Sequence, residues 1–599
     1  MFDPKALLDQ VLGGVGPDGQ RKGMSPEMVK GLAGGAALGG LAGILLGGKG
    51  AKKLAKTALK VGGTAALAGL AYKAYNDWQA AKSGSAPTPG NDRPPPAEGT
   101  AFLPAIPKAR DDLSLSLLRA MIAAAKADPR VAAALALRGV TDVASQVHME
   151  TWPIGAHIPD YLNDGRRLIW TPMWLRPHPS ANVYSHPING VYAIVDLRTN
   201  EVVAVEDHGV TPTPMTPGDW RLDQTGGTVQ LKNLDITQDQ GPSFTVDGWH
   251  VDWERWSMRI GWDQREGLVI HTVSFDDNGN RRAIAHRLSI AELVIPYGDP
   301  SQGTYRKNAF DTGEYGLGNY TNSLTLGCDC LGEIVYLDIA LADPRGNVRN
   351  IKKAICMHEE DVGILWKHID VDGHTEVRRG RRFVVSSIVT INNYEYGYFW
   401  YFYQDGTIGV EVKATGIPFP TGIAVGSPST YGNIIAPGVD SHAHQHVFSF
   451  RFDMAVDGDQ NAVRETNFAG KPMGPGNAYG NAIVPIETAL ARESEAQRNL
   501  DMGTQRYWKV INTGARNRLG QPTAYKLVPG VNALPYLDPE APIARRAGFM
   551  YRHFWATRYH PDELYPCGWY PNQHEGGDGL PKWVKEDRPL ENENVVVWY

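Results

Sequence analysis

Cysteine is scarce in this chain, with only four residues in 599. Four cysteines are too few for a disulfide scaffold. The chain also lacks a strong net charge, since its formal charge is −6, and it has no basic patch interleaved with aromatic residues. Both features argue against a nucleic-acid-binding body.

No internal repeat is evident, and no cleavable signal peptide is predicted, because the first apolar stretch begins too far from the N-terminus. The length favours several domains over a single core.

The N-terminal head, residues 1–82, is rich in Gly, Ala and Leu. Residues 31–48 carry no charge and reach the lower end of a membrane span. Glycines recur there every four residues, at 35, 39, 43 and 47, which places small side chains on one helix face. A second apolar stretch, residues 61–72, is too short to span unaided. We predict membrane contact through residues 31–72. The alternative is a Gly/Ala-rich soluble or disordered segment, because glycine weakens helices in water.

Five lysines separate the two apolar stretches, and the positive-inside rule places such a cluster in the cytoplasm. With a single span, or with a soluble head, the rest of the chain is cytoplasmic; with a hairpin it is periplasmic. Residues 7–14 and 69–75 resemble the YebE-like inner-membrane proteins of bacteria. That resemblance implies a bacterial, membrane-associated protein. Residues 83–110 follow, and their richness in Pro, Gly and Ser predicts a flexible to extended linker.

From about residue 240 onward the chain is predicted to be mainly β. Many short runs are separated by Gly and Pro turns, which is typical of a β-sandwich. Residues 394–403 and 407–412 flank Gln404-Asp405-Gly406, an Asp-Gly hairpin signal. The alternating aromatic residues of the first run are assigned to core packing; they are Tyr396, Tyr398, Trp400 and Phe402.

The His444-Gln445-His446 motif is the strongest single indication of chemistry. Side chains alternate along an extended strand, so His444 and His446 should project from the same side and could share a metal. Imidazole suits copper, zinc, iron and nickel, so the spacing alone does not choose among them. A strand that merely carries two histidines is the structural alternative. A zinc hydrolase is a weak alternative, because no H-E-x-x-H arrangement accompanies the pair.

Several blocks together resemble the copper-containing amine oxidases. They are residues 386–415, the run from His444 to Gly458, residues 473–477, 492–495 and 555–559, and the similarity continues in register from about residue 124 to the last residue. The resemblance implies a small α/β domain over residues 111–215 and a large β-sandwich catalytic domain over 216–599.

The same resemblance implies the catalytic residues. Tyr394, in the triplet Asn393-Tyr394-Glu395, corresponds to the tyrosine that copper and dioxygen oxidise to topaquinone, with Asn393 beside it in the cofactor site. Asp311, in Phe-Asp-Thr-Gly-Glu-Tyr, corresponds to the base that takes the α-proton of the amine. Tyr297 corresponds to the tyrosine that hydrogen-bonds the quinone oxygen. Ala309 stands where close relatives often carry a gating tyrosine, which predicts a wider entrance.

For the metals, the resemblance implies copper at His444 and His446. The family's third histidine follows a segment that here stops at Tyr599, so the catalytic domain is expected to be incomplete at its C-terminus. His442 is a poor substitute, because ligands at i, i+2 and i+4 spread over about 13 Å of extended chain. A calcium site at Asp453 and the Met454 carbonyl is also suggested, although Asn594 stands where the family has an aspartate.

The resemblance further implies a Cys330–Cys356 disulfide, which would favour an oxidising compartment, and a homodimer joined by hairpin arms. The function predicted is oxidation of a primary amine by dioxygen to aldehyde, ammonia and hydrogen peroxide. The alternative is a membrane-tethered, catalytically inactive scaffold, because the third copper ligand is missing.

Overall fold

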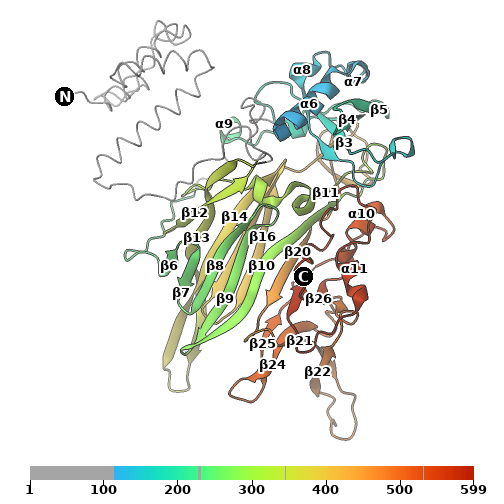
Figure 1. Ribbon diagram of the computed structural model, residues 1–599. Helices are drawn as coiled ribbons and strands as arrows, with labels where there is room; N and C mark the ends of the chain where they lie inside the picture. Colours follow the sequence, from blue (N-terminus) through green and yellow to red (C-terminus); the bar gives the residue numbers. More distant parts are fainter. Residues whose placement is uncertain (1–112, 227–230, 344–345, 531) are drawn as a thin grey trace, which may run out of the picture. The chain divides into compact units, whose positions relative to one another are not determined.

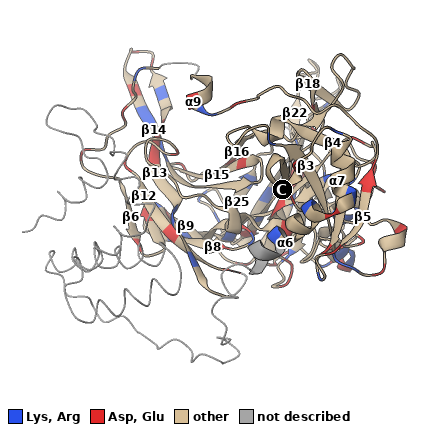
Figure 2. Cartoon of the chain, turned by 90° about the horizontal axis from the view of Figure 1, so that it is seen from above, with Lys and Arg blue, Asp and Glu red and all other residues tan. Residues whose placement is uncertain are grey.

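The computed structural model describes residues 113–226, 231–343, 346–530 and 532–599 (Figure 1). The head, the linker and the predicted membrane contact at 31–72 lie outside these residues and stay predictions. None of the helices in the described part is both long and apolar enough to cross a bilayer. Acidic and basic residues are interspersed over the fold in Figure 2.

The N-terminal part of the described chain packs helices on a five-stranded antiparallel sheet. Asp128 caps the second helix by accepting the Arg130 N–H, and Pro129 occupies its first turn, where no backbone donor is needed. Met121, Val131 and Leu135 of the helices are buried against the sheet. The elements are α6 (Leu113–Ala127), α7 (Pro129–Ala136), α8 (Val143–Gln146), β1 (Val147–Met149), β2 (Trp152–Pro153), β3 (Leu168–Leu175), β4 (Pro187–Asp196) and β5 (Val202–Asp207).

The rest of the described chain is built around a large antiparallel sheet in the order β23-β26-β27-β20-β10-β9-β8-β7-β6, with β11 pairing β10. Its strands are β6 (Phe244–Asp247), β7 (His250–Trp253), β8 (Trp256–Asp263), β9 (Gly267–Asp277), β10 (Asn280–Pro296), β11 (Asn308–Phe310), β20 (Val447–Met454), β23 (Gln497–Arg498), β26 (Phe554–Arg558) and β27 (Val595–Trp598).

A second antiparallel sheet faces it, in the order β12-β13-β14-β15-β16. Its strands are β12 (Val335–Ala342), β13 (Val348–Ile369), β14 (Thr375–Ile391), β15 (Tyr394–Tyr403) and β16 (Ile408–Gly416). One hydrophobic core joins the two sheets, with Trp253 and Trp256 from one packing near Phe383, Trp400 and Phe402 from the other. The predicted fold class, a mainly β chain whose large sandwich follows a small α/β domain, is confirmed.

Two smaller sheets and short helices complete the fold. They are β17 (Thr421–Gly422), β18 (Gly432–Ala436) and β19 (Val439–His442); β21 (Asn461–Gly470), β22 (Ile483–Leu490), β24 (Tyr507–Arg516) and β25 (Pro522–Leu527); the helices α9 (Leu222–Thr225), α10 (Pro542–Arg546) and α11 (Leu580–Trp583); and the 3-10 or π turns η2 (Asp160–Leu162), η3 (Val183–Ser185), η4 (Asp311–Tyr315), η5 (Leu317–Tyr320), η6 (Gly548–Tyr551) and η7 (Val584–Glu586).

The predicted hairpin at Asp405-Gly406 connects β15 to β16, and Gly406 takes the positive φ of +90° that the turn requires. The four aromatic residues assigned to the core are buried, as predicted: Tyr396, Tyr398, Trp400 and Phe402.

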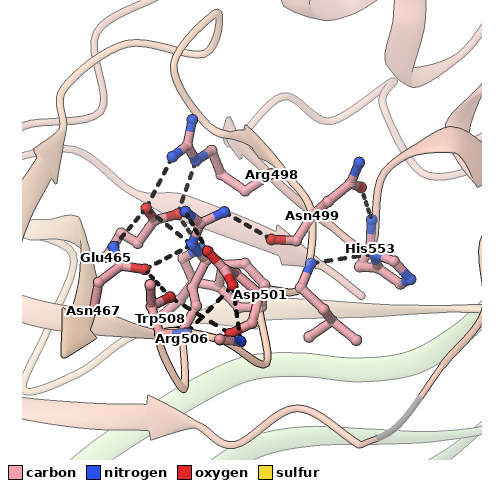
Figure 3. A network of polar contacts seen from close by, with 11 residues as sticks. Glu465, Asn467, Arg498, Asn499, Asp501, Arg506, Trp508 and His553 are labelled. Carbon is pink, nitrogen blue, oxygen red and sulfur yellow. Dashed lines mark hydrogen bonds and ion pairs between the residues drawn. The ribbon is translucent and has the colours of Figure 1, made fainter. Parts of the chain in front are cut away.

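A buried ionic network fastens the sheet that contains β21 to β23 of the large sheet (Figure 3). Glu465 of β21 accepts hydrogen bonds from Arg498 of β23 at 2.8 and 2.9 Å and from the indole of Trp508 at 3.1 Å. Arg506 lies 3.2 Å from the same carboxylate, and Asn467 donates to it. Each oxygen of this buried carboxylate therefore has charged or polar partners, which is the condition for a stable buried charge.

Candidate active site

Tyr394 lies at the hairpin corner between β14 and β15. It opens β15 and pairs with Ile391, the last residue of β14. Asn392, in the connecting turn, adopts a φ of +53°, which asparagine tolerates better than most residues. Asn393 is buried, and its amide donates to the Ile417 carbonyl at 2.6 Å. This hydrogen bond holds the turn in place and therefore fixes the position of Tyr394.

The Tyr394 hydroxyl has two side-chain partners. It lies 3.1 Å from His444 Nε2 and 3.2 Å from the Tyr297 hydroxyl. The Tyr297 ring in turn stacks on the His444 imidazole, with centroids 4.8 Å apart. Burial raises the pKa of Tyr394, and the hydrogen bond from Tyr297 opposes that shift. The structure thus brings Tyr394 together with one residue 97 positions before it and one 50 positions after it.

His444 and His446 lie on the same side of the chain, as predicted, but outside a regular strand. His444 forms an isolated bridge with Tyr297, and β20 begins only at Val447. The imidazole centroids are 5.0 Å apart. The Tyr396 hydroxyl, assigned only to packing from the sequence, lies 3.0 Å from His446 Nδ1.

Both imidazoles suit a metal. Burial lowers the pKa of His444, and it lowers the pKa of His446 to about 4, so both rings are neutral at pH 7. His444 Nδ1 lies 2.8 Å from the His442 carbonyl and donates to it, which leaves the lone pair of Nε2 facing Tyr394. His446 Nδ1 is engaged with the Tyr396 hydroxyl, so Nε2 is the nitrogen of this ring that is left for a metal. The donor set fits two ligand positions of a copper ion next to Tyr394.

His442 points elsewhere. Its Nε2 lies 3.1 Å from the Asp299 carboxylate, and β19 ends at this residue, which agrees with the expectation that His442 is a poor substitute for the third ligand. Among the residues that the structure describes, no group of three or more His, Cys, Asp or Glu side chains is arranged to hold a metal.

Asp311 begins the π-helical turn η4, directly after β11, and it is buried. Its Oδ2 has no hydrogen-bond partner within the described segments. Burial raises its pKa well above the usual range, and the nearby Glu314 and Glu292 carboxylates add to the shift. A buried carboxyl with an unoccupied oxygen is suited to taking a proton from a bound molecule.

A small cavity connects the predicted residues. Asp311, Tyr297 and Tyr394 all line it, and so does Ala309, the residue at the expected gate position. The other lining residues are Trp152, Ile295, Tyr315, Ile391, Asn392 and Asn393. Asp311 and Tyr394 therefore line one space.

Sequence reasoning missed the charged residues behind this cavity. Glu292 is fully buried in β10 and accepts the Gly313 N–H at 2.9 Å. Glu314 accepts the Phe310 N–H at 3.1 Å. Lys307 is also buried, with its ammonium 4.3 Å from the Tyr297 ring centroid, and burial lowers its pKa well below the usual range. Glu292 is the one charged residue in the apolar run 290–295. Because glutamate is rarely buried, its place in such a run could have indicated a functional role.

The residues expected to hold calcium and to form a disulfide lie in the described part of the chain. Asp453 Oδ2 lies 3.4 Å from Arg451, and Asn594 has a buried amide oxygen without a partner in the described segments. Cys330 and Cys356 lie in one hydrophobic cluster with their side chains in contact, but they are free thiols in the structure. Calcium at Asp453 and Met454 and the Cys330–Cys356 bond stay predictions.

The sheets, the cavity and the histidine pair describe a mainly β protein with two buried imidazoles beside a buried tyrosine. A family model described as "Copper amine oxidase, enzyme domain" matches residues 245–599, and one described as "Copper amine oxidase, N3 domain" matches residues 117–219. The chain belongs to the copper amine oxidase family. Residues 31–134 match a further family, described as a protein of unknown function (DUF533).

Named relatives agree with this assignment. The chain is 44% identical over 476 residues to a histamine oxidase of Arthrobacter globiformis, covering 79% of this chain and 69% of that protein. It is 43% identical over 494 residues to a peroxisomal copper-containing diamine oxidase of Nicotiana tabacum, covering 80% of this chain and 62% of the relative. The crystal structure of a copper-containing benzylamine oxidase from Hansenula polymorpha superposes with a TM-score of 0.74 at 32% identity, covering 81% and 77% of the two chains. The chain thus spans about two thirds of the length of these curated relatives.

Proposed function

We propose that this chain oxidises primary amines: RCH2NH2, dioxygen and water give RCHO, ammonia and hydrogen peroxide. The observation that carries the proposal is the arrangement at Tyr394. Its hydroxyl contacts His444 and Tyr297, and its ring lines the same cavity as the buried carboxyl of Asp311. The printed names of the relatives, which act on histamine, diamines and benzylamine, support an amine as the substrate.

His444 and His446 would hold copper, and Tyr394 would be the precursor of topaquinone. Together these groups supply a carbonyl that accepts the amine and a route for its two electrons to dioxygen. The side chains of the protein position the reacting groups and accept the proton. Asn393 anchors the loop, and Tyr297 holds the oxygen of residue 394 at hydrogen-bond distance. Asp311 takes the α-proton on its unoccupied Oδ2, at a site from which water is largely excluded by burial.

The shape of the cavity supports a substrate whose amine carbon lies between Asp311 and Tyr394. Ala309 presents only a methyl group to this space, and Trp152 provides an aromatic wall. Trp152 is held by its indole N–H, which donates to Glu150 at 3.0 Å, and by edge contact with Phe419. Aromatic monoamines and short diamines are both candidate substrates, and the cavity, of about 10 Å³, has to widen before either can enter.

The proposal includes a homodimer, the assembly typical of this family. The long hairpin of β13 and β14 extends from the sandwich and exposes apolar side chains near its tip. The exposed fraction is 58% for Ile364 and 47% for Trp366, and Val371 is fully exposed. Apolar side chains on a projecting hairpin are suited to packing against a second copy.

A second candidate is a catalytically inactive scaffold. One observation favours it: within the described segments, only two histidines converge on Tyr394. Two protein ligands hold copper more weakly than three, and without copper the tyrosine stays unmodified.

Phenylhydrazine separates the two candidates. The chain is expressed with copper in air and treated with the reagent, and the peptide containing residue 394 is analysed by mass spectrometry. A coloured adduct on this peptide, absent from Tyr394→Phe and present in Tyr398→Phe, supports the oxidase. Tyr398 is a suitable control, because its hydroxyl is buried without a partner in the described segments. An unmodified Tyr394 in folded, copper-loaded protein supports the scaffold instead.

A further inference from the structure

Arg546 is a fully buried arginine with no place in the reaction described so far. It ends helix α10, which lies close to β11 in Figure 1, and 1% of its surface is exposed. A buried guanidinium is costly unless each face and each donor has a partner. Both terminal nitrogens of Arg546 have a partner on one particular turn, although its Nε has no hydrogen-bond partner in the described segments.

The turn is the one that carries Asp311. Arg546 Nη2 donates to Asn308 Oδ1 at 2.7 Å, three residues before Asp311, and Nη1 lies 3.4 Å from Glu314 Oε1, three residues after it. The guanidinium carbon lies 4.4 Å from the centroid of the Phe310 ring. The guanidinium of Arg546 therefore contacts residues on both sides of Asp311 and also the Phe310 ring, which immediately precedes Asp311.

We propose that Arg546 is a positioning residue for the base: it holds the two flanks of the turn and so fixes where the Asp311 carboxylate faces the cavity. This inference rests on the proposed oxidase function. Asp311 needs such help because its own Oδ2 makes no hydrogen bond within the described segments. Its position is set by the backbone of η4, where Gly313 N–H is held by Glu292 and Phe310 N–H by Glu314.

A second link runs through Glu314. Burial raises the pKa of this carboxyl, and Arg546 opposes the shift. The ion pair thus favours the charged form of Glu314, whose other oxygen accepts the Phe310 N–H. Loss of Arg546 would leave a buried carboxylate unpaired next to Asp311, so it would protonate or rotate and release one flank of the turn.

The surroundings are shaped for a guanidinium. Arg546 Nη1 also donates to the Pro571 carbonyl at 3.0 Å. Gly155, from the N-terminal sheet region, approaches the group so closely that a Cβ there would lie 2.8 Å from Nη2, and its φ of +63° also favours glycine. The ammonium of lysine carries its donors on a single nitrogen and is not planar. Lysine therefore cannot reach both flanks of the turn at once or stack on the Phe310 ring.

The test compares Arg546→Gln and Arg546→Lys with the wild-type chain. The control is Arg588→Gln, which removes a partly buried arginine paired with Glu493 and Glu563. Each protein is assayed for phenylhydrazine-reactive sites per chain and for kcat and KM with an amine and its α-deuterated form. A displacement of about 1 Å costs on the order of 100-fold in rate. We therefore expect Arg546→Gln to lose about 100-fold in kcat per reactive site, with a larger isotope effect and little change in KM. Arg546→Lys should recover only part of the rate.

Crystal structures of the wild-type and Arg546→Gln chains supply a readout that does not depend on turnover. The inference expects the Asp311 carboxylate to move relative to Tyr394 in the variant. It is overturned if Asp311 stays in place, or if Arg546→Gln and Arg588→Gln lose rate per reactive site equally. A wild-type chain that forms no adduct and turns over no amine refutes the proposed function instead, and the crystal structures then still decide whether Arg546 sets the position of Asp311.

Discussion

The hydroxyl of Tyr394 lies 3.1 Å from Nε2 of His444, although the two residues are 50 positions apart in the chain. The contact depends on two separate pieces of backbone. A β-hairpin turn places Tyr394 at the first position of β15, and an isolated bridge to Tyr297 holds His444 just ahead of β20. A metal ion on His444 would therefore lie beside the tyrosine that it has to oxidise.

Copper binding should depend on His444 and His446 and not on His442. Loss of an outer partner of a metal ligand already costs 10- to 100-fold in affinity. We expect His444→Ala and His446→Ala each to lose at least about 10-fold in copper affinity, measured by equilibrium dialysis and elemental analysis. His442→Gln should bind like the wild type, because its side chain pairs with Asp299. An equal loss in His442→Gln would show that the third histidine is a ligand after all.

Asp311→Asn should separate cofactor formation from catalysis. An amide cannot take the α-proton, and general-base catalysis contributes about 10²–10⁴-fold. We expect a loss of that size in kcat, with phenylhydrazine-reactive Tyr394 retained. Thr312→Val is the neighbouring control, since the Thr312 hydroxyl is buried without a hydrogen-bond partner in the described segments. Full activity in Asp311→Asn would remove this residue from the role of base.

The sequence led to residues that occur in recognisable short motifs. Tyr394, Asp311 and the histidine pair each stand in a run that resembles a family block, and the structure places them together. Arg546 had no such motif, and its partner Glu314 is 232 positions away. Contacts over that distance depend on how the sheets pack, and no local spacing encodes them. His442 was predicted to be a poor substitute for the third ligand, and in the structure it pairs with Asp299 at the end of β19.

Glu292 should make the protein less stable as the pH rises. Burial is the main cause that raises the pKa of Glu292 to about 7 from its usual 4.5. The folded state therefore binds a proton that the unfolded state releases, so stability is full below pH 4.5 and falls between pH 4.5 and 7. Glu292→Gln keeps an oxygen for the Gly313 N–H and carries no such penalty. We measure the difference between the thermal unfolding midpoints of the variant and the wild type. This difference should increase between pH 4.5 and 7 in favour of the variant and stay constant at higher pH. A difference that is the same at pH 4 and pH 8 would contradict this.

Glu465 should stabilise the junction between β21 and β23. Glu465→Ala leaves Arg498, Arg506 and the Trp508 indole without their shared acceptor (Figure 3). Removing one partner of a buried ionic group costs about 3 kcal/mol, because the others stay desolvated and unpaired. Glu487→Ala is the control, since Glu487 pairs with Lys509 in a largely exposed position, where the cost is below about 1 kcal/mol. Hydrogen exchange of the β21 and β24 amides should accelerate far more in Glu465→Ala than in Glu487→Ala. Similar exchange in the two variants would mean that strand pairing alone holds these sheets together and that the buried carboxylate contributes little.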